Sequence, residues 1–241
     1  MKGTWIIAKR ELKTFFDSLM AYIVVVLFLG FSGFFTWISG ADVFLQGQAS
    51  LSSFFNIGYW TLFFFIPAIT MKLIAEERKT GTIELLLTKP ITDWDIVSGK
   101  FLSSLILIAI CLGLSLPYYI TVWRLGPVDH GAVWTGYLGL LLMSASYISL
   151  GLLASSITNN QIVAFLLTLI AGIFFHLLFG VMSQSLTGFF GKILHYLSMQ
   201  THFESISRGV IDLSDIIYYA SLILIGLLGS EMVLAKRNIV A

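Results

Sequence analysis

The chain has 241 residues, of which 57% are hydrophobic and only 11% are charged, and its formal net charge is +1. Soluble domains carry about 25% charged residues, so this composition excludes an ordinary cytosolic enzyme and a disordered tail. The net charge excludes a nucleic-acid binder that relies on a strong positive field, and the single cysteine excludes a disulfide framework or a thiolate metal cluster. The composition therefore predicts an integral membrane protein.

Residues 1–18 are predicted to form an interfacial helix on the inner face of the membrane. An apolar stripe recurs every three or four residues along it: Trp5, Ala8, Leu12, Phe15, Phe16 and Leu19. The basic residues lie on the opposing side, where they can meet anionic headgroups, so membrane lipid is an expected partner. Such a helix can also be a plain anchor that orients the chain.

Six charge-poor stretches are long enough to cross a bilayer, which needs about 20 apolar residues per helix. They cover residues 19–39, 52–74, 101–123, 133–157, 162–182 and 214–235. A membrane span must satisfy its backbone hydrogen bonds internally, and these runs lack the alternation of a membrane barrel, so each is predicted to be a helix. The expected fold class is all-α: one polytopic membrane domain over residues 1–241 with six transmembrane helices.

Lysine and arginine are divided unevenly between the two sides of this arrangement. If both termini share one side, that side holds 11 of the 14 basic residues and the other side holds 3. The positive-inside rule then places both termini in the cytoplasm.

The charges concentrate between the second and third spans, where residues 72–100 hold ten of the chain's 27 formal charges. Gly81 is expected to end the helix that leaves the second span, and Pro90 to end a short helix over residues 82–88. A helix with three consecutive leucines between charges can lie on lipid or dock in the groove of another protein. Its acidic neighbours favour docking, because an anionic leaflet repels them.

The residues after Pro90 predict an ordered helix start. Thr92 and Asp95 have the spacing of an acidic capping box, and Ile91 and Ile96 stand where a hydrophobic staple would be. A regular helix is therefore expected to lead into the third span.

The run EERKTGTIELLLTKPIT, residues 76–92, followed by Gly99 and Lys100, resembles the segment between the second and third spans of ABC-2 type transporter permeases. The span pattern and the amphipathic start are similar across essentially the whole chain. Residues 202–212 and the short length resemble the gliding-motility-associated (GldF-like) branch. The resemblance implies a cytoplasmic coupling helix within residues 76–100, seated on a separate ATP-binding subunit. The implied coupling residues are Glu76, Glu77, Arg78, Gly81, Thr82, Glu84, Leu86, Lys89 and Pro90.

By this resemblance the chain is the permease subunit of an ATP-binding-cassette transporter in the bacterial cytoplasmic (inner) membrane, and it performs export or mechanical work. The implied partners are an ABC ATPase subunit dimer, a second permease copy or related chain, and an accessory membrane subunit of the gliding-motility type. No nucleic-acid partner is expected. The sequence contains no G-x-x-x-x-G-K-[ST] run. ATP and Mg are therefore expected to be used by the partner ATPase; no cofactor is expected to bind this chain, and the chain is not expected to be an enzyme.

Residues 183–213 are predicted to form an external interfacial or partly re-entrant segment. By analogy with ABC-2 exporters it closes the outer mouth of the pathway, and a membrane-hugging loop is the plain alternative. The apolar residues assigned to this gate are Phe189, Phe190, Ile193 and Leu194. Thr201 and Glu204 predict a second capping box, and Gly209 the end of its helix.

Glu231 and His176 are the polar candidates inside spans. Glu231 can snorkel toward the basic residues 236–237, and His176 has no nearby carboxylate in sequence, so packing roles compete with functional ones. The alternative function, an ion-gradient-driven secondary transporter, would need buried acids and broken helices near the midplane, and only these two residues are available.

The fourth span is rich in serine and glycine, which favours close contact with other helices, although each serine can also bond to its own backbone. Pro67 and Pro117 predict kinks in the second and third spans, either as hinges or as packing irregularities.

Overall fold

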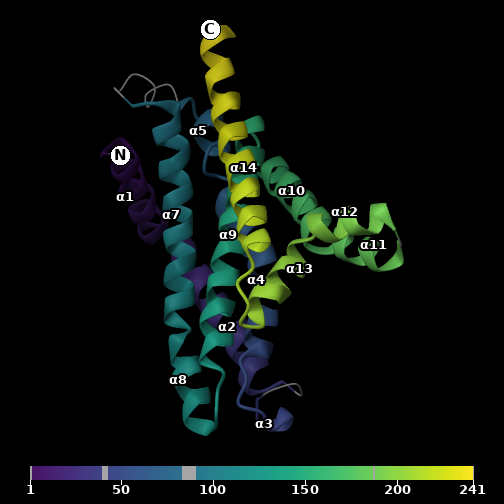
Figure 1. Cartoon of the computed structure of the whole chain (residues 1–241). Helices are drawn as coiled ribbons and strands as arrows, with labels where there is room; N and C mark the ends of the chain where they lie inside the picture. Colours follow the sequence, from purple (N-terminus) through teal and green to yellow (C-terminus); the bar gives the residue numbers. More distant parts are fainter. Residues whose placement is uncertain (1, 40–42, 83–90, 187, 241) are drawn as a thin grey trace.

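The computed structural model describes residues 2–39, 43–82, 91–186 and 188–240, and within them the regular secondary structure is entirely helical (Figure 1). Six apolar helical segments in this part are long enough to cross a membrane. They are Leu19–Trp37, Ser52–Lys79, Asp93–Leu125, His130–Ile157, Gln161–Ser185 and Leu213–Lys236. This confirms the all-α, six-span fold class and describes a multi-pass membrane protein.

Several spans are built from more than one helix. The first half of the chain forms α1 (Lys2–Asp17), α2 (Leu19–Trp37), α3 (Val43–Gln46), α4 (Ser52–Thr70), α5 (Ala75–Lys79), α7 (Asp93–Leu114) and α8 (Leu116–Leu125). The second half forms α9 (His130–Ile157), α10 (Gln161–Gly172), the π-helix η1 (Ile173–Leu178), α11 (Phe179–Ser185), α12 (Phe189–Leu197), α13 (Met199–Ser207) and α14 (Leu213–Val240). The start of α1 and the end of α14 lie at the same end of the molecule, the upper end in Figure 1.

The helix α9 is the centre of the bundle, since it packs against α4, α7, α10, α13 and α14. Of its most apolar window, 78% is buried, more than in any of the other five spans. Its serines serve both predicted purposes. The hydroxyls of Ser146 and Ser149 lie 3.2 Å from backbone carbonyls of α14, and each also lies near a carbonyl of its own helix, at 3.1 and 2.7 Å, as the Ser144 hydroxyl does at 2.6 Å. Small side chains therefore let α14 approach α9 closely.

Pro67 and Pro117, the prolines predicted to kink the second and third spans, both lie near breaks in these spans. Helix α4 ends at Thr70, three residues after Pro67, and a turn over residues 71–74 separates it from α5. Helix α7 ends at Leu114, and Pro117 stands in the first turn of α8. Pro117 lacks the N–H that continues an α-helix, which explains the break between α7 and α8.

The external segment leaves the bundle and returns to it. The fifth span tilts outward, α11 and α12 pack on each other as an arm at the right of Figure 1, and α13 returns to lie against α9. Gly209, with φ of 92°, follows α13 and ends it as predicted. The predicted capping box is wrong: Thr201 lies inside α13 and donates to the carbonyls of His195 and Ser198, while Glu204 accepts from Gln200.

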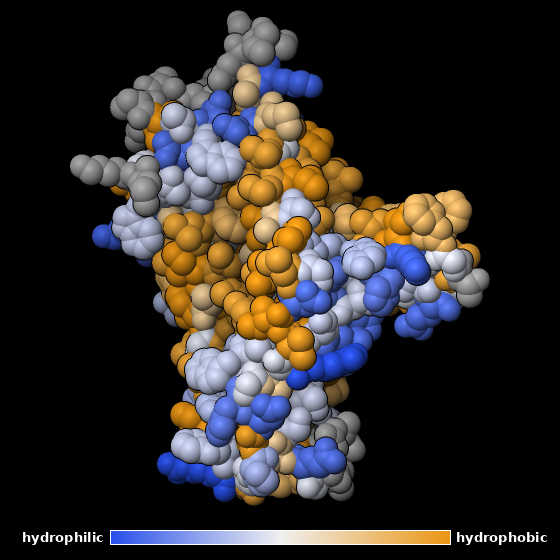
Figure 2. All heavy atoms as spheres, in the orientation of Figure 1, coloured by the Kyte–Doolittle hydropathy of each residue, from blue (hydrophilic) through white to orange (hydrophobic). Residues whose placement is uncertain are grey.

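The surface agrees with a membrane location. Figure 2 shows hydrophobic residues over the middle of the bundle and hydrophilic patches near its upper and lower ends. A further hydrophilic patch follows α13 and the lower side of the arm in this view.

Candidate functional site

The cytoplasmic end predicted from the sequence is built around the contact between α1 and α7. Thr4 bonds to Asp95, and Glu11 pairs with Lys100 further along, so the two helices run in the same direction. A Cβ atom at Gly99 would lie 2.7 Å from the Cβ of Ile7. Only glycine permits this approach, so α1 rests directly on the backbone of α7.

The predicted apolar stripe of α1 divides between two environments. Ala8 and Phe15 are buried, whereas Trp5 is 57% exposed on the surface that the sequence assigns to lipid. Leu19, the last residue of the predicted stripe, is the first residue of α2 and is 76% exposed. Ile7, outside the predicted stripe, is buried on the α7 side. The helix therefore packs on the bundle along one side and presents apolar side chains along another.

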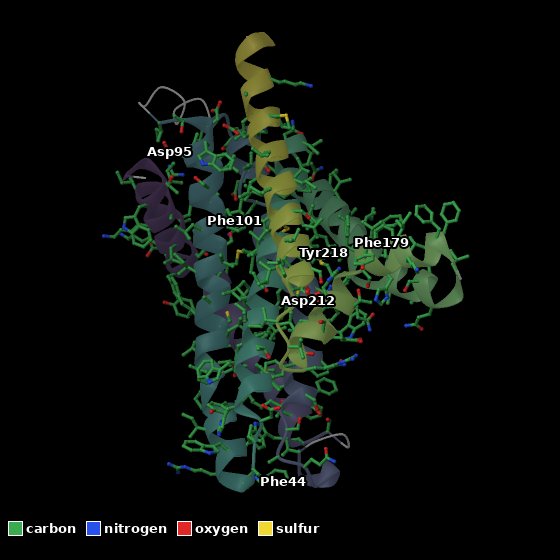
Figure 3. The ribbon with its side chains drawn as sticks, in the orientation of Figure 1. Phe44, Asp95, Phe101, Phe179, Asp212 and Tyr218 are labelled. Atoms are coloured by element: carbon green, nitrogen blue, oxygen red, sulfur yellow. The ribbon has the colours of Figure 1, made fainter. Side chains whose placement is uncertain are left out.

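Asp95 supports the start of both helices. It forms the predicted capping box of α7 with Thr92, which this geometry confirms. The same carboxylate accepts hydrogen bonds from the backbone N–H and the hydroxyl of Thr4 in the first turn of α1, at 3.0 and 2.7 Å. A carboxylate at a helix N-terminus satisfies free N–H groups and complements the helix dipole. Figure 3 shows Asp95 at the junction of α1 and α7.

The staple residues lie in the same contact. Ile96 is 1% exposed and packs with Ile7 of α1, and Ile91 packs against this pair. The staple therefore belongs to the interface between the two helices and not to α7 alone.

A buried lysine joins three elements of this end. The ammonium group of Lys100, on α7, is 1% exposed and lies 3.2 Å from Glu11 of α1 and 2.9 Å from Glu77 of α5. Arg10 pairs with the same two carboxylates from the exposed side. Two cations and two anions balance, which offsets the desolvation cost of burying Lys100. We call these four residues the cytoplasmic charge network.

The network changes the ionisation of its α1 member. Burial opposes the charged form of Glu11, but the Lys100 charge and the Arg10 hydrogen bond outweigh burial and lower the pKa of Glu11 below its ordinary value. The carboxylate is therefore held in the ionised form that the network needs.

The helix α5 is also tied to the end of α9. The Ser155 hydroxyl accepts hydrogen bonds from the backbone N–H groups of Ile74 and Ala75, at 3.1 and 3.0 Å, and donates to the carbonyl of Met71. The guanidinium of Arg78 donates to the carbonyl of Ser156. The turn after α4 is thus held by hydrogen bonds to the central helix.

A pocket of about 510 Å³ opens between α1, α5 and α7. The residues that line it are Arg10, Glu11, Thr14, Phe15, Lys72, Leu73, Glu76, Glu77, Thr80, Thr82 and Lys100. Its charged lining has three basic and three acidic residues, so it presents no strong net charge to a ligand.

The predicted coupling residues separate into three groups. Glu76, Gly81 and Thr82 are exposed at this end of the molecule, and Gly81, with φ of 72°, follows the end of α5 as expected. Glu77 and Arg78 instead turn inward to the contacts described above. The remaining four, Glu84, Leu86, Lys89 and Pro90, lie outside the described residues.

The predicted gate residues lie on the arm. Phe189 and Phe190 are 73% and 72% exposed, Ile193 is exposed and Leu194 is half-buried. Within this single chain the two phenyl rings contact each other, with ring centres 6.0 Å apart.

Of the two intramembrane candidates, His176 has the more unusual environment. It lies on the π-helix η1, is fully buried, and stacks on Tyr59 with ring centres 3.6 Å apart. Neither ring nitrogen has a hydrogen-bond partner among the described residues. Glu231 is half-buried on α14. In the described part of the chain, no group of three or more His, Cys, Asp or Glu side chains could hold a metal ion.

Sequence reasoning missed two charged groupings. The sequence indicates Lys100 only as part of the motif that resembles ABC-2 permeases, whereas in the structure this residue is the centre of the cytoplasmic charge network. Sequence reasoning also missed the buried pair of His202 on α13 and Asp215 on α14, whose Nδ1 and Oδ1 atoms are 2.6 Å apart. No local spacing rule joins these residues, since the chain turns between the two helices.

Comparison with known proteins agrees with this architecture. Residues 5–235 match the family model described as ABC-2 family transporter protein. Over 101 residues, 42% of this chain, the sequence is 30% identical to the "Probable multidrug ABC transporter permease YbhR" of Escherichia coli strain K12, and likewise to its counterpart in Escherichia coli O157:H7. The matched region spans 27% of the length of these relatives. The family match covers nearly the whole chain, and the chain belongs to the ABC-2 transporter family.

Proposed function

We propose that this chain is the membrane permease subunit of an ATP-binding-cassette transporter. In this proposal a separate ABC ATPase dimer hydrolyses ATP with Mg, and its movement drives export or mechanical work through the spans. A second permease copy or a related chain completes the pathway. Family membership supports the permease role, and the names of the E. coli relatives describe the same kind of protein.

One observation carries the coupling proposal: the two spans that flank the predicted coupling segment are tied together at its base. Lys100 on α7 and Glu77 on α5 form an ion pair of 2.9 Å, and both pair with residues of α1. A force applied between Gly81 and Thr92 would therefore move three helices together. A loosely attached loop would absorb that force.

The exposed residues at this end supply the contact surface in the proposal. Glu76, Gly81 and Thr82 are exposed and would meet the ATPase. The proposal assigns the same role to Glu84, Leu86, Lys89 and Pro90 from the sequence alone. Glu77 and Arg78 would act from inside the bundle, where their contacts hold α5 in place. The roles proposed for these residues thus divide into docking and support.

The finer assignments are part of the same proposal. The excess of basic residues at the end that carries both termini supports a cytoplasmic location for that end, in a bacterial inner membrane. The resemblance of residues 202–212 supports the gliding-motility branch and its accessory membrane subunit. The exposed phenyl rings of Phe189 and Phe190 support a gate role for the arm, because they offer apolar area to a second permease chain.

Co-purification tests the coupling proposal. The tagged full chain is isolated from its native membranes in mild detergent, and the co-purified material is assayed for ATP hydrolysis. We expect an ATP-hydrolysing subunit that is lost when residues 82–90 are deleted. Charge reversal by Glu76→Lys should weaken the association and leave the spans folded.

The matched control is Lys192→Glu, a charge reversal at an exposed residue of α12 on the external arm. It should leave the ATPase bound. Retention of the ATPase at wild-type level after the deletion would overturn the coupling proposal. Transport that continues without any ATPase and responds to an ion gradient would favour the secondary-transporter alternative.

A further inference from the structure

A buried ionisable pair lies where the external segment meets α14. His202 is 6% exposed and Asp215 is 3% exposed. Nδ1 of His202 lies 2.6 Å from Oδ1 of Asp215, and Nε2 lies 3.0 Å from the backbone carbonyl of Tyr196, at the end of α12. The imidazole therefore bridges three helices: α12, α13 and α14.

This geometry determines where protons must lie. A backbone carbonyl can only accept, so Nε2 of His202 carries a hydrogen. The other ring nitrogen is within hydrogen-bond distance of a carboxylate oxygen, so a second proton lies between Nδ1 and Oδ1. Whether it sits on the ring or on the carboxyl group, the pair as a whole holds one proton more than a neutral histidine beside an ionised aspartate.

Loss of that proton removes one of the two contacts of the imidazole. The single remaining ring hydrogen either stays on Nε2, which leaves a lone pair facing the carboxylate, or stays on Nδ1, which leaves a lone pair facing the carbonyl of Tyr196. The second oxygen of Asp215 has no hydrogen-bond partner among the described residues, so it offers no compensating contact there. A buried anion without a donor is costly.

The tyrosines around the pair donate their own hydrogens to backbone carbonyls, so the shared proton stays between His202 and Asp215. On α14, Tyr218 stacks on the imidazole at 4.0 Å between ring centres, and Tyr219 lies at 6.3 Å. The phenol of Tyr218 donates to the carbonyl of Leu197, and that of Tyr219 to the carbonyl of Met199.

The other helices that pack on α13 present mostly uncharged groups to it. The helix α9 offers Gly139, which meets the side chain of Phe203, and α11 offers Gly180. From η1, His176 is separated from Phe203 by the ring of Tyr59, which stacks on both. On the exposed side of α13, the carboxylate of Glu204 pairs with Arg208 and accepts from Gln200.

We propose that His202 and Asp215 form a proton-binding latch, in which one shared proton holds α12 and α13 against the start of α14. The latch is closed while the proton is bound. When pH rises and the proton leaves, the end of α12 and the whole of α13 loosen from α14. Figure 3 shows Tyr218, whose ring covers the imidazole, where α13 meets α14.

The latch lies in the external segment and does not depend on the proposed ATPase coupling. Its ligand is the proton, and its two residues, His202 and Asp215, have no role in the coupling proposal. If the arm closes the outer mouth of the pathway, the latch would make its position sensitive to the pH outside the cell.

Two measurements on the full chain in lipid bilayers test the latch. In protein labelled with 15N-histidine, solid-state NMR reports the protonation of each of the four histidines, and the His202→Gln variant identifies the His202 signals. Hydrogen exchange of residues 189–209, corrected for the intrinsic pH dependence, reports how firmly the segment is held. Both are followed from about pH 5 to about pH 10, and we expect exchange to accelerate about tenfold with the same midpoint as the change in the His202 signals.

Matched controls are His195→Gln and Asp212→Asn, an exposed histidine on α12 and an exposed aspartate just before α14. Both should keep the wild-type pH transition. His202→Gln and Asp215→Asn should both lose the pH transition, because neither variant has the shared proton; in Asp215→Asn the amide N–H can donate to Nδ1 of a neutral ring. The latch is overturned if wild-type exchange shows no transition over this range, if its midpoint differs from that of the His202 signals, or if His202→Gln keeps the wild-type transition. If a variant does not fold, the comparison of the two midpoints in the wild-type protein is sufficient to decide the test.

Discussion

The end of this molecule that is predicted to be cytoplasmic and the segment that is predicted to be external both hold peripheral helices with buried charges, but by different means. At the cytoplasmic end, four charged residues join α1, α5 and α7, and two cations share the same two carboxylates. At the other end, one imidazole–carboxylate pair joins α13 to α14, beside two hydrogen bonds from tyrosine phenols of α14. The first arrangement has duplicate charged partners and suits a stiff connection. In the second, the charged contact depends on one proton and suits a connection that can loosen.

The largest expected effect comes from removing the centre of the cytoplasmic charge network. Lys100→Met leaves Glu11 and Glu77 with only the exposed cation of Arg10, so the free energy of unfolding should fall by about 3 kcal/mol. Thermal unfolding of the purified full chain in detergent measures the loss. Lys79→Met, which removes an exposed lysine of α5, should change it by less than about 0.5 kcal/mol. Equal stabilities for the two variants would contradict a central role for Lys100.

A steric change separates the two helices without touching a charge. In Gly99→Ala the new Cβ would lie 2.7 Å from Ile7 Cβ and 2.9 Å from the carbonyl of Thr4, so α1 must shift, at a cost of about 1–3 kcal/mol. Gly113→Ala, on the same helix, meets no atom within 4 Å and should stabilise α7 by about 0.5–1 kcal/mol. Thermal unfolding of both variants checks the difference, and a shared sign would show that the close approach is unimportant.

The two ends should respond to pH in opposite directions. The pKa of Glu11 is lowered in the folded chain, so its stabilising contribution is fully present above its ordinary value of 4.5 and is lost as pH falls through the lower folded value. Hydrogen exchange of α1 should therefore accelerate on acidification, whereas the external latch loosens as pH rises. Glu11→Gln should remove the part of the acid response that Glu11 causes. An unchanged acid response in this variant would contradict the assignment.

The smallest effect is expected for the exposed ion pair on α13. Glu204 and Arg208 are 3.6 Å apart, and their side chains are 48% and 74% exposed, so Glu204→Gln should cost no more than about 0.5 kcal/mol. His202→Gln, on the same helix, removes a buried partner and should cost more. Thermal unfolding of the two variants compares an exposed pair with a buried one at the same location. A larger loss for Glu204→Gln would reverse the ranking.

Local patterns predicted local structure well. The six spans, the capping box of Thr92 and Asp95, and the helix ends at Gly81 and Gly209 all follow from residues close together in the chain. The capping box expected at Thr201 failed because α13 already begins at Met199, which places Thr201 within the helix. A short capping motif cannot by itself specify where the preceding turn ends.

The candidate sites were predictable only in outline. The charge density between the second and third spans pointed to the cytoplasmic end, but the inward orientation of Glu77 and Arg78 depends on where α7 and α9 stand. The pairing of His202 with Asp215 was not predictable from spacing. It arises from a chain reversal between two helices, and no periodicity encodes that reversal.

The sequence by itself determined that this protein is a six-span membrane helix bundle of the ABC-2 family, because hydropathy over a bilayer's thickness and a family motif are properties of the chain. Only the tertiary structure decided which charged residues are buried and which residues they pair with. The reason is physical: a buried charge is tolerated only where partners from other helices meet it, as they do at Lys100 and Asp215. These contacts arise from the packing of helices and not from residues that are neighbours in the sequence.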